Sequence, residues 1–236
     1  MIAIESTDRV FVLTGAGISA ESGLPTFRAE DGLWAGRNIE EVCTPEALAR
    51  NPALVWQFYV ARREAASKAE PNAGHLALAE LEAQLGERFF LCTQNVDTLH
   101  ERSGSRRLVH MHGQLDMARC ERNCGRPAVQ DTALYASLDE VGRCACGARL
   151  RPHIVFFGEI PLEMARIEAE IDGCTVMVVI GTSGSVYPAA GFVHWARQAG
   201  ARTVYIGPEP PLNSEYFTHT VTGKAGEVLP GLFACK

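Results

Sequence analysis

Short apolar runs rich in β-branched residues alternate along this chain with segments of helical periodicity. The runs lack the polar and apolar alternation of a half-exposed strand, and are typical of strands buried on both faces of a sheet. They span residues 10–13, 89–92, 154–157, 176–180 and 203–206. Helical patterns lie at residues 53–69, 75–85, 163–171 and 189–199. This order predicts an α/β fold with a doubly wound parallel sheet.

Small or polar loops follow four of the predicted strands. They read TGAGIS, TQNVD, GTSGS and GPEP, and they begin at Thr14, Thr93, Gly181 and Gly207. Ligands of doubly wound folds bind outside the carboxyl ends of the strands. Polar loops occur there in any α/β protein, but four of them together favour one shared crevice.

Composition narrows the class of protein. The chain has 236 residues, 47% of them hydrophobic, which predicts one principal core with a smaller lobe. Its net charge of -6 argues against a general attraction to nucleic acid or anionic lipid. The first residues do not resemble a signal peptide, and the uncharged stretch 173–196 contains polar side chains that disfavour a membrane span. We therefore expect a cytoplasmic protein.

The loop after the first strand has the pattern of a phosphate-binding turn. Residues 15–20 fit G-x-G-x-x-A, in which glycines let the backbone approach a pyrophosphate. Gly23 and Pro25 would break the helix that follows in an ordinary dinucleotide-binding unit, so we expect a long loop that folds over the ligand. In that loop, Phe27 and Arg28 are either a lid aromatic and a phosphate-binding cation, or a packed Phe and a solvated Arg.

Two pairs of polar residues have the spacing of a shared pocket. Asn95 and Asp97 lie two apart after a strand, and they could hold a carboxamide or a ribose or form an Asx-turn. His110 and His112 are also two apart, and an extended chain would point both to one side, whereas a turn would separate them. A histidine suits general-base catalysis, although either one alone could be structural.

Four of the eight cysteines are clustered. Their spacing, C-x3-C, nineteen residues, then C-x-C, departs from the commonest zinc pattern but can close a structural four-thiolate zinc site. The surrounding segment, residues 116–151, has few large apolar residues, so a metal would supply the stability that a core does not. The cluster consists of Cys120, Cys124, Cys144 and Cys146.

Taken together, these motifs resemble the sirtuins, the NAD-dependent protein-lysine deacylases. GAGISAESGLPTFR, TQNVD, HMHG, the paired cysteines, RPHIVFFGE and GTSGSVYPAA occur in the order typical of that family, and the chain is most similar to its bacterial class III, desuccinylase-type branch. The resemblance implies a Rossmann-type domain and a smaller domain, with NAD and an acyl-lysine peptide meeting between them. The Rossmann-type domain would comprise residues 1–31, 70–114 and 153–236, and the smaller one a helical insertion, 32–69, and a zinc insertion, 115–152.

The resemblance also implies roles for individual residues. His112 would be the general base, and Asn95 and Asp97 would also be catalytic. His110 would contact these residues without touching the ligand. The chain departs from the family at Gly207, where members often have Asn, so Glu209 is expected to hold the adenosine ribose. The implied NAD site is Gly15, Ala16, Gly17, Ala20, Phe27, Arg28, Trp34, Gln94, Asn95, Val96, Asp97, Gly181, Thr182, Ser183, Gly207, Glu209 and Ala225. The implied peptide-binding stretch contains Val155, Phe157, Gly158 and Glu159.

Tyr59 and Arg62 bear on the choice of substrate. They lie three apart in a helical pattern and share a face, where a phenol and a guanidinium could receive a carboxylate. In isolation Arg62 would be read as a surface salt-bridge partner, but in the family Tyr-x-x-Arg at this place marks enzymes that remove succinyl and malonyl groups.

The expected activity is therefore NAD-dependent removal of acetyl and acidic acyl groups from protein lysines. The products would be nicotinamide, deacylated lysine and O-acyl-ADP-ribose, and the expected cofactors are NAD and zinc. We expect acylated lysine side chains of proteins as partners, no direct nucleic-acid or membrane partner, and a monomer, although composition does not determine oligomeric state.

Three other functions share some of these features. A mono-ADP-ribosyltransferase could use the same scaffold. An NAD-linked oxidoreductase would share the glycine motif, but its helix would not be broken after Ala20. A zinc-stabilised binding module would share the cysteine cluster, but it would not need the QNVD and HMHG motifs.

Overall fold

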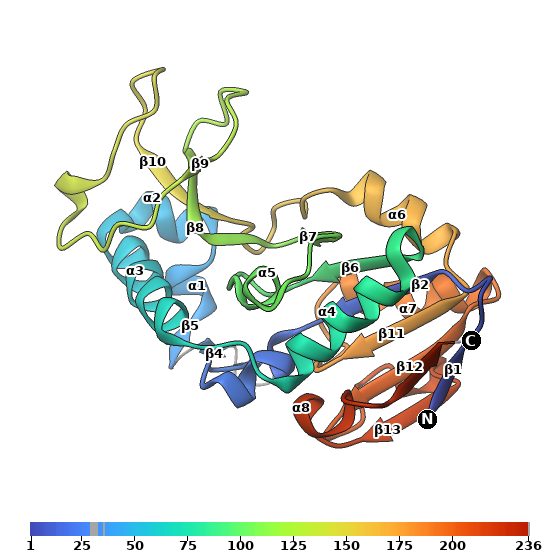
Figure 1. The fold of residues 1–236 in the computed structure, drawn as a ribbon. Helices are drawn as coiled ribbons and strands as arrows, with labels where there is room; N and C mark the ends of the chain where they lie inside the picture. The colour runs from blue at the N-terminus through green and yellow to red at the C-terminus, as the bar shows by residue number, and fades with distance from the viewer. Residues whose placement is uncertain (29–32, 35, 236) are drawn as a thin grey trace.

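A parallel sheet forms the centre of the larger of two lobes in this computed structural model, which describes residues 1–28, 33, 34 and 36–235 (Figure 1). The side chains of residues 27, 28, 33 and 34 also lie outside the described part. Within the described residues this sheet has six strands, and neighbouring strands are parallel. In spatial order they are β13 (His219–Thr222), β12 (Arg202–Gly207), β11 (Val176–Ile180), β2 (Val10–Thr14), β6 (Phe89–Thr93) and β7 (Leu108–His110).

The strand order places the first of these strands in the middle of the sheet. β2, β6 and β7 extend the sheet in one direction, and the chain then returns to β11, beside β2, before it adds β12 and β13. This is the strand order of a Rossmann-type fold, which confirms the predicted doubly wound core. β2 and β11 therefore flank the point where the strand order reverses, and ligands of such folds bind there.

One of the five predicted strands is wrong. The other four are present in this sheet, with bounds shifted by at most one residue. At residues 154–157, however, the chain leaves β10 (Leu150–Ile154), which pairs antiparallel with β8 (Gly113–Cys120) in the smaller lobe. The apolar residues of this run serve another purpose: Phe156 is buried in the core of the smaller lobe, while Phe157 is exposed.

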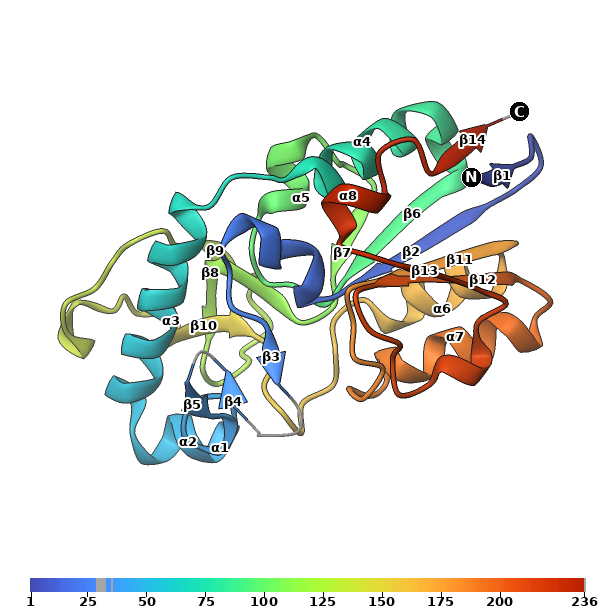
Figure 2. The ribbon, with the colours of Figure 1, turned by 90° about the horizontal axis from the view of Figure 1, so that it is seen from below.

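Helices cover both faces of the sheet (Figure 2). On one face α4 and α8 pack against the strands through residues such as Leu78, Leu81 and Leu229. On the other face α6 and α7 do so through residues such as Ile171 and Phe192. The bounds of the helices in this lobe are α4 (Ala73–Leu85), α5 (Leu99–Ser103), α6 (Met164–Asp172), α7 (Ala189–Gln198) and α8 (Ala225–Val228), with short 3-10 turns η2 (Gly86–Arg88) and η4 (Ser214–Tyr216).

The two ends of the described chain lie side by side (Figures 1 and 2). β1 (Ile2–Ile4) pairs in parallel with β14 (Phe233–Cys235) in a separate small sheet. The uncharged stretch 173–196 forms β11, a loop and most of α7. No helix among the described residues combines the length and the apolar character needed to cross a bilayer.

The smaller lobe is built from two segments that are far apart in the sequence. The first contributes helices whose starts are fixed by polar caps, since Thr44 accepts the amide of Ala47 and Asn51 accepts that of Leu54. The second contributes an antiparallel sheet. Their elements are α1 (Ile39–Val42), α2 (Pro45–Arg50), α3 (Pro52–Lys68), β8, β9 (Val129–Gln130), η3 (Leu138–Glu140) and β10, and three short strands precede them, β3 (Phe27–Arg28), β4 (Leu33–Trp34) and β5 (Arg37–Asn38).

The two segments share one hydrophobic core. Val55 and Phe58 of α3 pack with Leu115 of β8 and Ile154 of β10. The four predicted helices are confirmed, α3 among them, with bounds shifted by at most two residues. The exact limits of the two insertions, residues 32–69 and 115–152, stay a prediction.

Two glycine turns touch at the centre of the larger lobe. After β2 the chain forms a 3-10 helix, η1 (Ala16–Ser22), which ends at Gly23, so the continuous helix of an ordinary dinucleotide unit is interrupted as predicted. The amide of Gly17 donates to the carbonyl of Gly181, after β11, at 2.8 Å. A Cβ on Gly17 would lie 2.6 Å from Gly181 Cα, and Gly181 itself has φ +61. Both turns therefore require glycine.

We expect Gly181→Ala to lower the free energy of unfolding by about 2 kcal/mol or more, because it combines a left-handed backbone with a clash. The added Cβ would lie 2.6 Å from the amide nitrogen of Ile18. Gly200→Ala is the matched control, since Gly200 has φ +94 but open space around it. Denaturant unfolding measures both, and equal losses would contradict the importance of the contact.

Candidate active site

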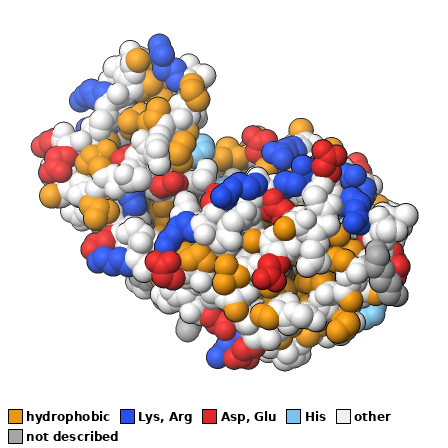
Figure 3. Space-filling model, in the orientation of Figure 1, with side chains coloured by type: hydrophobic (Ala, Val, Ile, Leu, Met, Phe, Trp, Pro, Cys, Tyr) orange, Lys and Arg blue, Asp and Glu red, His pale blue; other side chains and the backbone are white. Residues whose placement is uncertain are grey.

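The predicted shared crevice is confirmed. The loops after β2, β6, β11 and β12 line one cavity of about 1080 Å³, and the smaller lobe closes its other side. The surface is hollowed between the lobes (Figure 3). The site residues predicted from the sequence that line this cavity are Gly15, Ala16, Gly17, Arg62, Gln94, Asn95, Val96, Asp97, His112, Val155, Phe157, Gly158, Glu159, Gly181, Thr182, Ser183 and Glu209.

Other predicted site residues lie elsewhere. Ala20 is exposed at the far end of η1, Ala225 is buried at the start of α8, and Gly207 ends β12 without lining the cavity. Tyr59 is buried behind the wall of the cavity. The side chains of Phe27, Arg28 and Trp34 are outside the described part of the chain, so their roles stay predictions.

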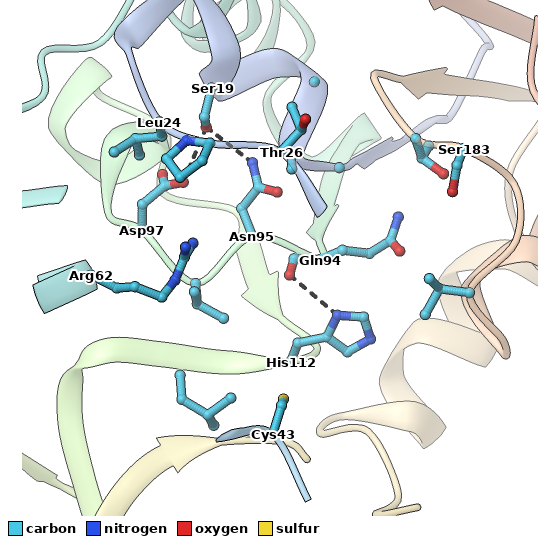
Figure 4. Close-up of a pocket in the computed structure, with 18 of the residues that line it drawn as sticks. Ser19, Leu24, Thr26, Cys43, Arg62, Gln94, Asn95, Asp97, His112 and Ser183 are labelled. Carbon is cyan, nitrogen blue, oxygen red and sulfur yellow. Dashed lines mark hydrogen bonds between the residues drawn. The ribbon is translucent and has the colours of Figure 1, made fainter. Parts of the chain in front are cut away.

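His112 lies at the floor of the cavity. Its Nδ1 is 3.2 Å from the carbonyl oxygen of Gln94 (Figure 4). A carbonyl can only accept, so Nδ1 carries the proton and Nε2 holds a lone pair. Burial lowers the pKa of His112 to about 4, so the ring is neutral near pH 7. His112 is thus able to accept a proton.

Asn95 and Asp97 lie in the same part of the cavity, and the hydroxyl of Ser19 links their side chains (Figure 4). The amide of Asn95 donates to Ser19 Oγ at 3.1 Å, and Ser19 Oγ donates to Asp97 Oδ2 at 3.1 Å. The backbone amide of Leu99 donates to the other carboxylate oxygen. Burial raises the pKa of Asp97. The geometry suits a polar pocket that grips a carboxamide or a ribose, as the spacing suggested.

A turn separates the two histidines of the HMHG motif. His110 ends β7 and faces away from the cavity, with its ring between Asn95 and Glu101. His112 follows the turn and faces the cavity. Gly113 makes this possible, because its φ is +86 and any Cβ there would collide with the carbonyl of His153.

Arg62 of α3 lines the cavity, whereas its predicted partner does not. Burial lowers the pKa of Arg62 to about 10, which leaves the guanidinium charged near pH 7. The hydroxyl of Tyr59 donates to Cys43 Sγ at 3.2 Å. Cys43 lines the cavity, so Tyr59 bounds this end of it through Cys43.

Glu159 anchors the loop that follows β10. Arg151 binds both carboxylate oxygens, at 2.7 and 3.1 Å, and Arg119 binds one of them at 2.8 Å. The backbone amide of Phe156 donates to the same carboxylate, and the Arg151 guanidinium stacks 3.9 Å from the Phe156 ring. These contacts fix the loop in which Val155, Phe157 and Gly158 line the cavity.

The four clustered cysteines converge at the far end of the smaller lobe. The Sγ atoms of Cys120 and Cys146 are 3.5 Å apart, those of Cys124 and Cys144 are 3.6 Å apart, and all four lie within 4.8 Å of one another. A tetrahedron with Zn–S bonds of about 2.3 Å places its sulfurs about 3.8 Å apart. The cluster fits a structural zinc site, and four thiolates leave no open position for catalysis.

Sequence reasoning did not single out several residues of the site. Ser19 belongs to the GAGIS motif, but its bridging position depends on the distance between two loops. Cys43 and Tyr205 line the cavity from apolar surroundings that look like ordinary core. Glu101 is a charged residue on a short helix, and nothing in its neighbourhood in the sequence signals a buried partner.

The fold and the site define a class of protein: a Rossmann-type nucleotide-binding enzyme with a lobe that a metal can stabilise. The particular family follows from comparison with known proteins. The profile of the Sir2 family matches residues 15–188, and the chain belongs to that family. The resemblance to sirtuins is therefore confirmed.

Similar proteins and solved structures support the assignment to the Sir2 family. The chain is 52% identical over 225 residues to a protein of Caulobacter vibrioides named NAD-dependent protein deacylase, which covers 94% of both chains. A protein of the same name from Shewanella oneidensis is 49% identical, covering 94% of this chain and 92% of the other. A Sir2 homolog bound to NAD has a TM-score of 0.86 at 39% identity, covering 96% and 89%. A complex of Sir2 with a p53 peptide and NAD+ has a TM-score of 0.80 at 27% identity, covering 96% and 92%.

We expect Cys124→Ser to reduce the zinc content of the purified protein and to lower its Tm. The segment 116–151 has few large apolar residues, so it would lose the metal that stabilises it. Cys235→Ser is the matched control, since Cys235 is exposed and lies outside the cluster. Metal analysis and thermal unfolding measure the two effects. Unchanged zinc in Cys124→Ser would show that this thiol is not a ligand.

Proposed function

We propose that this member of the Sir2 family is an NAD-dependent protein-lysine deacylase that removes acetyl groups and, by preference, succinyl and malonyl groups. The observation that carries the proposal is the single cavity in which His112, the Ser19–Asn95–Asp97 group and the glycine turns meet. NAD-dependent protein deacylation is also the activity for which the relatives are named.

The residues present fit NAD. At Gly15 and Gly17 a Cβ would meet Gly181 at 2.8 Å or less, so glycine lets the two turns pack against each other. The backbone of this turn lines the cavity, where it would face the pyrophosphate. The Ser19–Asn95–Asp97 group would hold the nicotinamide and its ribose. Glu209, at the opposite end of the cavity, would accept hydrogen bonds from the adenosine ribose.

His112 would act as the general base. The chemistry supplied by bound NAD is a ribosyl C1′ that accepts the acyl-lysine oxygen as nicotinamide leaves. With NAD bound, Nε2 of His112 would accept a proton from a ribose hydroxyl and so make that hydroxyl a better nucleophile. The hydrogen bond from Nδ1 to Gln94 holds the ring in the tautomer that this step needs. The products would be nicotinamide, deacylated lysine and O-acyl-ADP-ribose.

Arg62 would select the acyl group. A guanidinium can bind a carboxylate with two charge-assisted hydrogen bonds, and this one is partly buried in the wall of the cavity. Tyr59 donates a hydrogen bond to Cys43, and Cys43, which lines the cavity, would form the end of the acyl pocket. An acetyl group has no carboxylate, so its binding would gain no charge-assisted hydrogen bond from Arg62.

The substrate would be an extended segment of another protein. The loop at residues 155–159 would pair with it as an added strand, and the Glu159 contacts with Arg151 and Arg119 would hold that loop in place. No nucleic acid or membrane partner is proposed. A monomeric state and a cytoplasmic location stay predictions.

We expect His112→Ala to lower kcat for formation of the deacylated peptide by about 10²- to 10⁴-fold, because the base that acts after nicotinamide has left is removed. Binding of NAD should change little, since the cofactor is held mainly by other residues. Matched acetyl-lysine and succinyl-lysine peptides, with NAD affinity from calorimetry, test this. A loss of NAD binding as large as the loss of rate would refute the assigned role.

We expect Arg62→Ala to lower kcat/KM for the succinyl peptide by roughly ten- to a hundredfold, because a charge-assisted pair is lost. Turnover of the acetyl peptide should fall far less. Arg62→Lys tests whether two parallel hydrogen bonds are needed, and Arg50→Ala, on an exposed helix of the same lobe, is the control. Equal losses on both peptides would rule out a carboxylate receptor.

A further inference from the structure

His110 is a buried histidine whose two ring nitrogens both have partners. Its Nδ1 lies 2.9 Å from the carbonyl oxygen of Asn95, in the loop after β6. Its Nε2 lies 2.6 Å from Oε1 of Glu101, on α5. The ring therefore links three elements: the edge strand β7, the loop that carries Asn95 and Asp97, and a short helix after that loop.

Both partners of His110 are acceptors. A peptide carbonyl cannot donate a hydrogen bond, and neither can an ionised carboxylate. Both ring nitrogens must then carry protons, which makes His110 an imidazolium. His112 differs, because among the described residues an acceptor faces only its Nδ1, which leaves Nε2 as a base. Two histidines two residues apart are thus held in different protonation states by their partners.

We propose that Glu101 and His110 form a partly buried charged pair that positions Asn95 and Asp97 by holding the carbonyl oxygen of Asn95. His110 does not line the cavity, so it is a positioning residue and touches neither substrate nor cofactor. The proposal rests on the proposed function only for its effect on rate. The protonation state of the pair is a property of the free protein.

The backbone of Asn95 is held on its other side as well. Its amide donates to Thr93 Oγ1 at 3.0 Å, and Thr93 Oγ1 also accepts from Thr14 Oγ1 at 2.8 Å. His100 lies 3.0 Å from Thr14 Oγ1 and completes this buried chain. Of these two anchors of the Asn95 backbone, the one through Thr93 is neutral, and the one through His110 depends on a charge.

The groups around His110 favour its charge on balance. Burial opposes the charge, but the hydrogen bond and the negative charge of Glu101 outweigh burial, with help from Asp97, so the pKa of His110 is raised above 6.5. His100, on α5, and His153, on β10, also face it, and His110 helps to lower the pKa of each, which keeps both neutral. Glu101 is held ionised in turn, because His110 lowers its pKa despite burial.

The pair makes the position of the loop dependent on pH. Since the pKa of His110 is raised, the imidazolium persists to a higher pH than that of an ordinary histidine, and it is lost as the pH rises through the raised pKa. One of its two acceptors then loses its donor. We expect kcat/KM to fall at alkaline pH to a plateau roughly ten- to a hundredfold lower, because misplaced reactive groups lose that much rate.

Nitrogen-15 NMR of histidine-labelled protein tests the pair without substrate. The His110 resonances are assigned by their loss in His110→Gln, with His219→Gln as the control for an exposed histidine. We expect both ring nitrogens of His110 to be protonated at pH 7 and His112 to be a neutral Nδ1–H tautomer. A neutral His110 at pH 7 would overturn the proposal, whatever the activity of the chain.

Glu101→Gln tests the effect on rate. A Gln amide can donate to Nε2, so a neutral His110 would keep both of its hydrogen bonds and the alkaline decline of kcat/KM should disappear. A purely structural role for Glu101 would lower the rate at every pH and leave the shape of the profile unchanged, and that result would overturn the proposal. A chain that binds NAD but deacylates neither peptide would contradict the proposed function, while the NMR result would still decide the state of the pair.

Discussion

The close contact of two backbone turns at the middle of the sheet is the constraint on which the site depends. Because the strand order reverses between β2 and β11, the loops that leave these strands diverge to opposite faces and open a crevice. The crevice stays narrow because Gly17 and Gly181 meet through a backbone hydrogen bond with no side chain between them. The polar side chains of the β6 loop can therefore face both turns across one cavity.

The smaller lobe supplies the second wall of the cavity. A Rossmann-type sheet offers loops on one edge only, and a deep pocket needs a second wall. α1, α3 and the antiparallel pair of β8 and β10 form that wall, and they bring Cys43, Arg62 and the loop after β10 to the cavity that His112 lines. The wall is fixed by its own core around Phe58 and Ile154 and by the ion pairs of Glu159.

The sequence predicted the sheet well because the strands buried on both faces are continuous apolar runs. It failed at residues 154–157, where an equally apolar run serves a lobe core and a cavity edge. The short strands β7 and β13 also went unpredicted, since β7 is three residues long and β13 is mostly exposed. Short or exposed strands carry too little periodicity to be seen.

The loops of the site could be predicted from the sequence, but their internal contacts could not. Motif order identified the segments, and the ends of parallel strands necessarily meet at one edge. In contrast, the bridge from Asn95 through Ser19 to Asp97 and the seating of His110 against Glu101 depend on how three loops and a helix align in space. Spacing alone left His110 and His112 equivalent, and only the turn between them separates their roles.

The burial of each cysteine determines the order in which the thiols of the folded protein react with sulfhydryl reagents. Among the described cysteines, Cys43, Cys92 and Cys174 are buried, whereas Cys124, Cys146 and Cys235 are exposed. Alkylating agents and oxidants therefore reach the metal cluster, at the end of the lobe farthest from the cavity, before they reach the thiol that lines the cavity. Inactivation by such reagents would therefore report damage to the support of the second wall before any modification of Cys43.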